Sequence, residues 1–167
     1  GMIKSFYPSV TTSDIEKTPY VDLQASCYDL EAVGESWENL LATDVLHHLR
    51  RPFDFFRSAA RVLNPGGRIL LCEPAATAFG ALFYRLFHHE PIQPSKLNPP
   101  FIIKGEVSEN EEFANMGMAA ALFRNHRKWT EETLAEMGLA VVSVHYRDFF
   151  AYPLTGGLSK PQMVPTG

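Results

Sequence analysis

Cysteine, long apolar runs and an excess of positive charge are what this sequence has least of. Its two cysteines, Cys27 and Cys72, cannot form the disulfide framework that stabilises small secreted domains, and they fit a reducing compartment best. No apolar run is long enough to cross a bilayer. The net charge of -4 argues against a surface that holds nucleic acid by its phosphates. What is left is a globular chain, 46% hydrophobic and 20% charged.

The length and the first residues bear on domain count and compartment. A chain of 167 residues holds one ordinary domain rather than two, so we predict a single domain over residues 1–167. The first ten residues, GMIKSFYPSV, lack the cationic flank and apolar core of a secretory signal. We therefore expect a cytoplasmic protein.

Residues 39–74 form the most informative stretch, NLLATDVLHHLRRPFDFFRSAARVLNPGGRILLCEP. Its first part, residues 39–44, is almost continuously apolar, which is typical of a strand in a sheet covered on both faces. Its last part, residues 68–73, is a second such run, and it makes Cys72 a small core residue. Strands that are apolar on both faces are typical of a parallel sheet.

An amphipathic helix links these two strands. Phe55, Ala59 and Val62 recur at helical spacing, while the charged side chains lie elsewhere on the helical wheel. Pro65-Gly66-Gly67 then ends the helix and turns the chain. The order of strand, helix and strand predicts a β-α-β unit.

The rest of the chain predicts further alternation of strands and helices. Thr130 has the residue type and the acidic neighbours of a helix N-cap, and Gly138 ends that helix. Such alternation favours an α/β sandwich with a mainly parallel sheet. The other expected elements are short strands at 9–15 and 20–25, helices at 78–88 and 109–125, a loop at 90–108 and a long strand at 139–150.

Residues 44–74 resemble the second half of a class I S-adenosylmethionine-dependent methyltransferase of the quinone-biosynthesis subgroup. In that family a strand, a Val-Leu-His-His corner, a helix and a Leu-x-Pro-Gly-Gly-Arg turn follow one another, as they do here. The resemblance implies a Rossmann-like three-layer α/β sandwich with a mainly parallel sheet and an antiparallel C-terminal strand. It also implies S-adenosylmethionine as the cofactor.

The family's glycine-rich loop, which brings backbone N–H groups against the cofactor, has no counterpart before Ser13. We therefore expect the first β-α unit to be missing. That strand is central in the family, so its absence would separate the strands at 9–15 and 20–25 from the two strands of residues 39–74. Exposed strand edges pair readily. We expect a homodimer, a partner chain at the exposed edge, direct pairing of the two halves, or a sequence that is a piece of a longer protein carrying the missing strand.

The resemblance also implies a set of cofactor-binding residues. Asp14 stands where the family's second strand ends and an acidic side chain accepts the ribose hydroxyls, although an Asp after Ser also suits a turn. Ile15 would lie against the adenine, or it is an ordinary core residue. Ser26 and Cys27 follow the third strand, and Thr43 stands near the end of the fourth.

Catalytic candidates gather at the corner after residues 39–44. Methyl transfer needs alignment of the two reactants, and oxygen or activated carbon acceptors also need a base for their proton. Asp44 ends the strand where the family's substrate and cofactor meet; helix capping is its alternative role. His47 and His48 are adjacent and point in different directions, so one of them packs or caps. We take His48 as the member that faces the site.

His88-His89-Glu90 groups three polar side chains at the end of a predicted helix. The group lacks the i, i+4 histidine pair of a helical metal site and a third ligand at a recognisable interval, so we expect no metal. His88 is our third catalytic candidate, as a general base. Polar or cationic residues beside the negative pole of a helix explain the group without any function.

Two classes of function stay open. The first is an enzyme that transfers a methyl group from S-adenosylmethionine to a small organic acceptor. The second is a catalytically inactive methyltransferase-like domain that acts as a binding or partner subunit. The absent loop favours the second, as does Ser26, which stands where the family carries an acidic residue.

Overall fold

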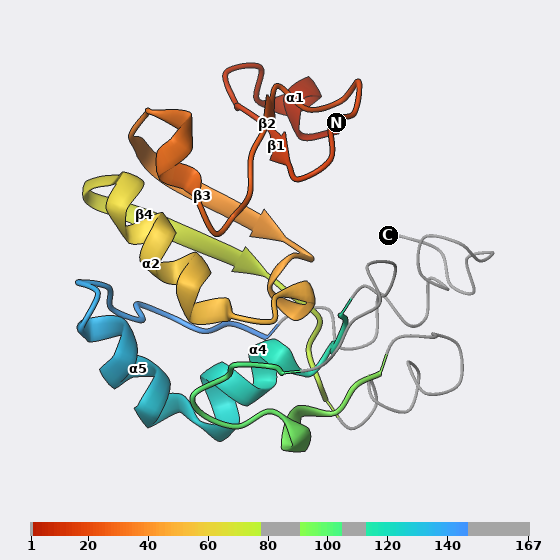
Figure 1. Cartoon of the computed structure of the whole chain (residues 1–167), viewed down its shortest axis with the longest axis vertical. Helices are drawn as coiled ribbons and strands as arrows, with labels where there is room; N and C mark the ends of the chain where they lie inside the picture. Colours follow the sequence, from red (N-terminus) through yellow and green to blue (C-terminus); the bar gives the residue numbers. More distant parts are fainter. Residues whose placement is uncertain (1, 78–90, 105–112, 147–167) are drawn as a thin grey trace. The chain divides into compact units, whose positions relative to one another are not determined.

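The computed structural model describes residues 2–77, 91–104 and 113–146 (Figure 1). The chain divides into two compact units. The first unit comprises Gly1–Leu41 and Pro52–Leu70, and the second comprises Ala42–Arg51 and Leu71–Gly167. None of the helices in the described ranges is both long enough and apolar enough to cross a membrane.

The first unit begins with a short helix and two short strands. Helix α1 (Met2–Phe6) precedes β1 (Ser13–Asp14) and β2 (Leu23–Gln24). The two strands pair in parallel, with Ser13 opposite Leu23 and Asp14 opposite Gln24. The strands predicted at 9–15 and 20–25 are therefore present, although each is reduced to two residues.

The β-α-β unit predicted for residues 39–74 is confirmed. Strand β3 (Trp37–Thr43), helix α2 (Pro52–Val62) and strand β4 (Leu63–Cys72) follow one another, and β3 pairs with β4. The arrows of β3 and β4 point the same way in Figure 1. Phe55, Ala59 and Val62 are buried on α2, as their spacing predicts.

The Pro-Gly-Gly turn belongs to the start of β4 rather than to a separate loop. Gly66 has φ +80, a left-handed conformation that only glycine adopts at low cost. Gly67 comes so close to its surroundings that an added Cβ would lie 2.8 Å from the carbonyl oxygen of Asn64. Both glycines are therefore required by the path of the chain.

The prediction that both strands are covered on both faces is wrong for the described residues. Leu41 is 54% exposed and Leu70 is 47% exposed, while the alternating Leu40 and Ile69 are half-buried. This is the alternation of a sheet packed on one side. Cys72 is likewise exposed at the end of β4, so it is not the core residue that the apolar run predicts.

The β1–β2 and β3–β4 pairs form two separate two-stranded sheets in the described part of the chain. Direct pairing between the two halves, one of the expected arrangements, is not formed among these residues. A two-stranded pair is marginally stable by itself. Each pair therefore depends on contacts outside its own ladder.

Helices dominate the described part of the second unit. Helix α4 (Met118–Ala120) leads into a π-helix (Ala121–Asn125), and α5 (Arg127–Ala135) follows. Met118, Ala121 and Leu122 are fully buried. Of the helix predicted at 109–125, residues 118–125 are helical, 113–117 are not, and 109–112 lie outside the described residues.

Two predictions for the C-terminal part need correction. Thr130 is not an N-cap, because α5 begins at Arg127, and its buried hydroxyl instead donates to the carbonyl of Leu122 at 2.9 Å. Residues 139–146 form no strand, and the rest of the strand predicted at 139–150 lies outside the described residues. Gly138 does end the helical region, with φ +77. The helix predicted at 78–88 also lies outside the described residues.

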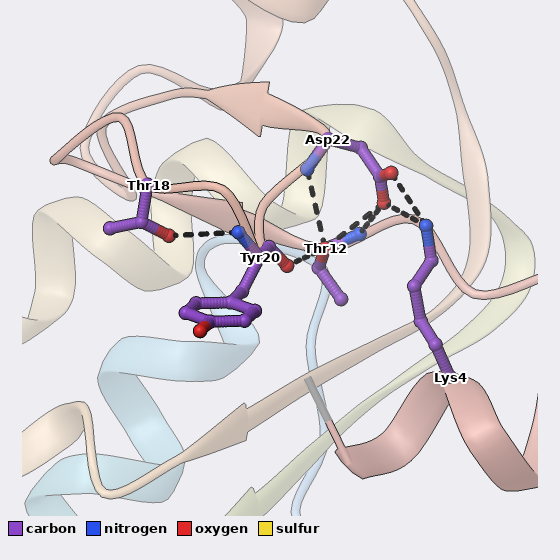
Figure 2. Close-up of polar contacts among 5 residues, drawn as sticks. All are labelled: Lys4, Thr12, Thr18, Tyr20 and Asp22. Atoms are coloured by element: carbon purple, nitrogen blue, oxygen red, sulfur yellow. Dashed lines mark hydrogen bonds and ion pairs between the residues drawn. The ribbon is translucent and has the colours of Figure 1, made fainter.

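A polar cluster around Asp22 holds the N-terminal part of the first unit together (Figure 2). The Asp22 carboxylate accepts from Lys4 Nζ at 2.5 and 2.6 Å and from the Thr12 backbone N–H at 2.8 Å. The Thr12 hydroxyl also donates to Asp22 at 3.0 Å. These contacts connect α1, the approach to β1 and the approach to β2. They lower the pKa of Asp22 from 3.8 to about 2, and the hydrogen bond from Lys4 is the largest cause.

Replacing Asp22 should make stability less dependent on pH in the acid range. The carboxylate is stabilised in the folded state, so its contribution is complete above pH 3.8 and is lost as the pH falls through about 2. Asp22→Asn should therefore unfold at a lower temperature than the parent at pH 7, with the gap closing towards pH 2. Thermal unfolding across this range measures the gap. Glu16→Gln, an exposed change in the same unit, should show no gap; an Asp22→Asn gap that persists at pH 2 would contradict the assignment.

The Thr130 hydroxyl should contribute measurably to stability, because it is fully buried and hydrogen-bonded. Thr130→Val removes the donor and leaves a buried carbonyl with one bond fewer, which should lower the free energy of unfolding by about 1–2 kcal/mol. Thr133→Val is the matched control, because the Thr133 hydroxyl bonds the Trp129 carbonyl at a half-buried position of the same helix. Urea unfolding should rank Thr130→Val as the more damaging change, and equal losses would refute a special role for this contact.

Candidate active site

The corner, residues 44–48, joins β3 to the segment before α2. Asp44 has φ 54, a left-handed conformation that is uncommon for a residue other than glycine. Its backbone N–H donates to the carbonyl of Cys72 at 2.9 Å, which extends the contact between β3 and β4 past the end of β3. Asp44 is exposed and His48 is half-buried. The corner therefore presents two titratable side chains at the carboxyl ends of neighbouring parallel strands, where ligands bind in open α/β sheets.

The side chain of Glu73, directly after β4, is buried against this corner. Its Oε1 accepts from the backbone N–H groups of Val45 at 3.0 Å and Leu46 at 2.7 Å. Its Oε2 lies 2.8 Å from Nδ1 of His47, and the two side chains are only 3% and 4% exposed. One carboxylate thus bonds three consecutive residues of the corner.

The two histidines of the corner have different surroundings. His47 is the packed member of the pair, with 2% of its surface exposed. Nδ1 of His48 lies 3.1 Å from the carbonyl oxygen of Phe113. A carbonyl oxygen can only accept, so this contact places a proton on Nδ1 and makes Nε2 the accepting nitrogen of the neutral His48 ring. His48 therefore has the tautomer that a general base with Nε2 as the reacting atom requires.

Asn115 ties the corner to the loop at 91–97. Its backbone N–H donates to the carbonyl of His47 at 2.9 Å. Its side chain accepts from the N–H groups of Gln93 and Gly117 and donates to the carbonyl of Gln93. Since Asn115 is 6% exposed and its side-chain oxygen and nitrogen are both hydrogen-bonded, the corner is held by buried polar contacts as well as by its own turn.

Asp14 and Ile15 lie at the end of β1 in the first unit. Both are exposed, and Ile15 keeps 69% of its surface open, so it is not the core residue that the alternative interpretation expects. Asp14 Oδ1 accepts from the backbone N–H of Glu16 at 3.0 Å. The carboxylate therefore makes the local turn that the sequence allows, and it is also presented to solvent at a strand end.

The remaining predicted cofactor residues differ in exposure. The Ser26 hydroxyl accepts from the backbone N–H of Tyr28 at 3.2 Å. Cys27 is half-buried, and burial raises the pKa of its thiol, which favours the neutral form. Thr43 is exposed at the end of β3. Asp14, Ile15, Ser26 and Cys27 belong to the first unit, whereas Thr43, Asp44 and His48 belong to the second.

Glu73 is the residue that reasoning from the sequence missed. The apolar pattern predicts it only as the last position of a buried strand. The available signal was an acidic residue at the carboxyl end of an apolar strand, directly before Pro74. His88, the third catalytic candidate, lies outside the described residues. Among the side chains that the structure describes, no group of three or more His, Cys, Asp or Glu could hold a metal ion.

Comparison with known proteins bears on the first part of the chain. No curated protein matches the sequence, and no solved structure matches it. A family model described as a methyltransferase domain matches residues 7–71, from the approach to β1 to the penultimate residue of β4. The match covers less than half of the chain. It supports a methyltransferase with a Rossmann-like α/β fold, a family whose usual cofactor is S-adenosylmethionine.

Proposed function

We propose that this chain binds S-adenosylmethionine and transfers its methyl group to a small organic acceptor. The observation that carries the proposal is the match of residues 7–71 to a methyltransferase domain, because that stretch includes Asp14 and the corner from Asp44 to His48. When bound, the cofactor supplies an electrophilic methyl group. The chain's own residues then have two tasks: to hold the cofactor and to take a proton from the acceptor.

Asp14 and Ile15 fit the nucleoside part of the cofactor. A carboxylate accepts from two hydroxyl groups at once, and the ribose diol offers two donors. Asp14 is exposed at a strand end, and its Oδ1 uses one lone pair for the turn, which leaves acceptor capacity on both oxygens. The exposed side chain of Ile15 offers an apolar surface for one face of adenine. Ser26, Cys27 and Thr43 complete the proposed cofactor set.

Asp44 and His48 fit the second task. When an acceptor bearing an acidic proton attacks the methyl carbon, the proton goes to a nearby base. Asp44 is exposed at the corner, and Nε2 of His48 is the accepting nitrogen of a ring fixed by Phe113. Neither role requires a metal. His88 remains a proposal for a third proton-transfer group.

Titration calorimetry with adenosylhomocysteine, the product form of the cofactor, tests the proposal. The full chain should bind it, and Asp14→Asn should raise Kd by about tenfold or more, because a charged acceptor of two hydroxyl groups is lost. Asparagine keeps Oδ1 for the bond from the Glu16 N–H. The substitution therefore separates the ribose contact from the local turn.

Asp54→Asn is the matched control, because it removes a carboxylate whose ion-pair partner is Arg57 on the surface of α2. It should leave Kd within about twofold of the parent. Absence of binding by the parent chain at millimolar adenosylhomocysteine would refute cofactor binding by this polypeptide. Equal affinities for the parent and Asp14→Asn would refute the role of Asp14.

The second candidate function is a non-catalytic partner subunit. The separation of the β1–β2 and β3–β4 sheets favours it, because each described sheet has only two strands and therefore offers edges for pairing. A homodimer or a partner chain at such an edge is the arrangement we propose. Analytical ultracentrifugation should show a dimer at micromolar concentration. A monomer up to about 100 μM would exclude the homodimer and leave a different chain as the partner.

A further inference from the structure

The corner has the backbone of an anion-binding nest. Asp44 is left-handed, with φ 54, and Val45 follows in a right-handed helical conformation with φ -111 and ψ -45. Successive N–H groups converge in such a turn and favour a negative group. Here the N–H groups of Val45 and Leu46 both point at Oε1 of Glu73. The anion in the nest is thus the protein's own carboxylate, supplied by the end of the neighbouring strand.

The other oxygen of this carboxylate determines the proton position on His47. An ionised carboxylate has no proton to donate, so a 2.8 Å contact to a ring nitrogen requires the proton on that nitrogen. With Glu73 ionised, the proton therefore lies on Nδ1 of His47. The pair is almost fully buried, which excludes competing water from the contact.

Burying a carboxylate is costly, and an apolar residue of similar size is often the more stable choice. Here the buried carboxylate stabilises one conformation of the turn. Asp44 has a left-handed conformation that is uncommon outside glycine, so contacts around it are needed to hold it. Glu73 bonds the three residues that follow Asp44, so its carboxylate opposes relaxation of the turn directly.

We infer that Glu73 is a positioning residue that fixes the corner, by filling the nest of Val45 and Leu46 and by holding the proton of His47 on Nδ1. It acts through these groups on the two residues that the corner presents, Asp44 and His48. That these two residues lie at the reacting centre rests on the proposed function. The role of Glu73 goes beyond the family match, which ends at residue 71.

Nitrogen NMR of the histidine rings tests the inference without any ligand. In the parent chain Nδ1 of His47 should have the chemical shift of a protonated nitrogen, with the His47 signals assigned from a His47→Gln variant. Glu73→Gln keeps the shape and the oxygen in the nest, but it turns an NH2 group towards His47. The proton should then move to Nε2. A role limited to packing would not move it.

Amide hydrogen exchange measures the nest. In Glu73→Gln the amides of Val45 and Leu46 should exchange at least tenfold faster than in the parent, because a neutral oxygen holds them less strongly. Glu38→Gln, an exposed change on β3, is the matched control and should alter neither the exchange nor the His47 ring.

Two results would overturn the inference. One is a parent spectrum in which the proton of His47 lies on Nε2 alone, and this result needs no variant to fold. The other is a folded Glu73→Gln variant with an unchanged ring and unchanged amides. Failure of adenosylhomocysteine to bind would refute the proposed function but would leave both NMR readouts in force, so the two failures are distinguishable.

Discussion

Glu73 places one carboxylate among two backbone N–H groups and an imidazole, and the corner after β3 depends on those contacts. Asp44 is left-handed, a conformation that is uncommon outside glycine, and the contacts of Glu73 hold the residues that follow it. The contact is long-range in sequence, since Glu73 lies 26 to 28 positions after the residues it bonds. It joins the end of β4 to the turn after β3, so it needs both strand ends in place. The conformation of the corner therefore depends on the pairing of the two strands.

In the N-terminal part of the first unit, too, contacts of a carboxylate hold segments that short strands cannot hold alone. β1 and β2 pair over only two residues each, and such a ladder supplies little stability of its own. The Asp22 carboxylate joins α1, through Lys4, to the approach to β1, through Thr12 (Figure 2). In both units a single carboxylate connects segments that their own hydrogen-bond ladders do not hold. The difference is burial: Asp22 remains exposed, whereas Glu73 is enclosed.

The sequence predicted what local patterns determine. Helix α2 and the strands beside it follow from apolar spacing and from a Pro-Gly-Gly turn, which act within a few residues. Thr130 shows where such reasoning fails. Its type and its acidic neighbours suit an N-cap, but the helix begins earlier at Arg127, and the hydroxyl serves the π-helix instead. The exposure of Leu41 and Leu70 was also beyond prediction, because an apolar run does not say whether a second layer is present.

The candidate site likewise contains residues that the sequence predicts and one that it does not. Asp44 and His48 could be named from their place after a strand, and the buried partner of the histidine pair could be expected because adjacent side chains diverge. Glu73 could not be found by spacing, since its partners, residues 45–47, precede α2 in the sequence and Glu73 follows β4. Its place at the end of a strand is nevertheless informative. The carboxyl ends of adjacent parallel strands lie side by side, so an acidic residue that ends one strand stands beside the turn that follows its neighbour. Converging N–H groups in that turn attract the carboxylate. In a β-α-β unit, an acidic residue directly after the second strand is therefore a candidate to fix the turn after the first.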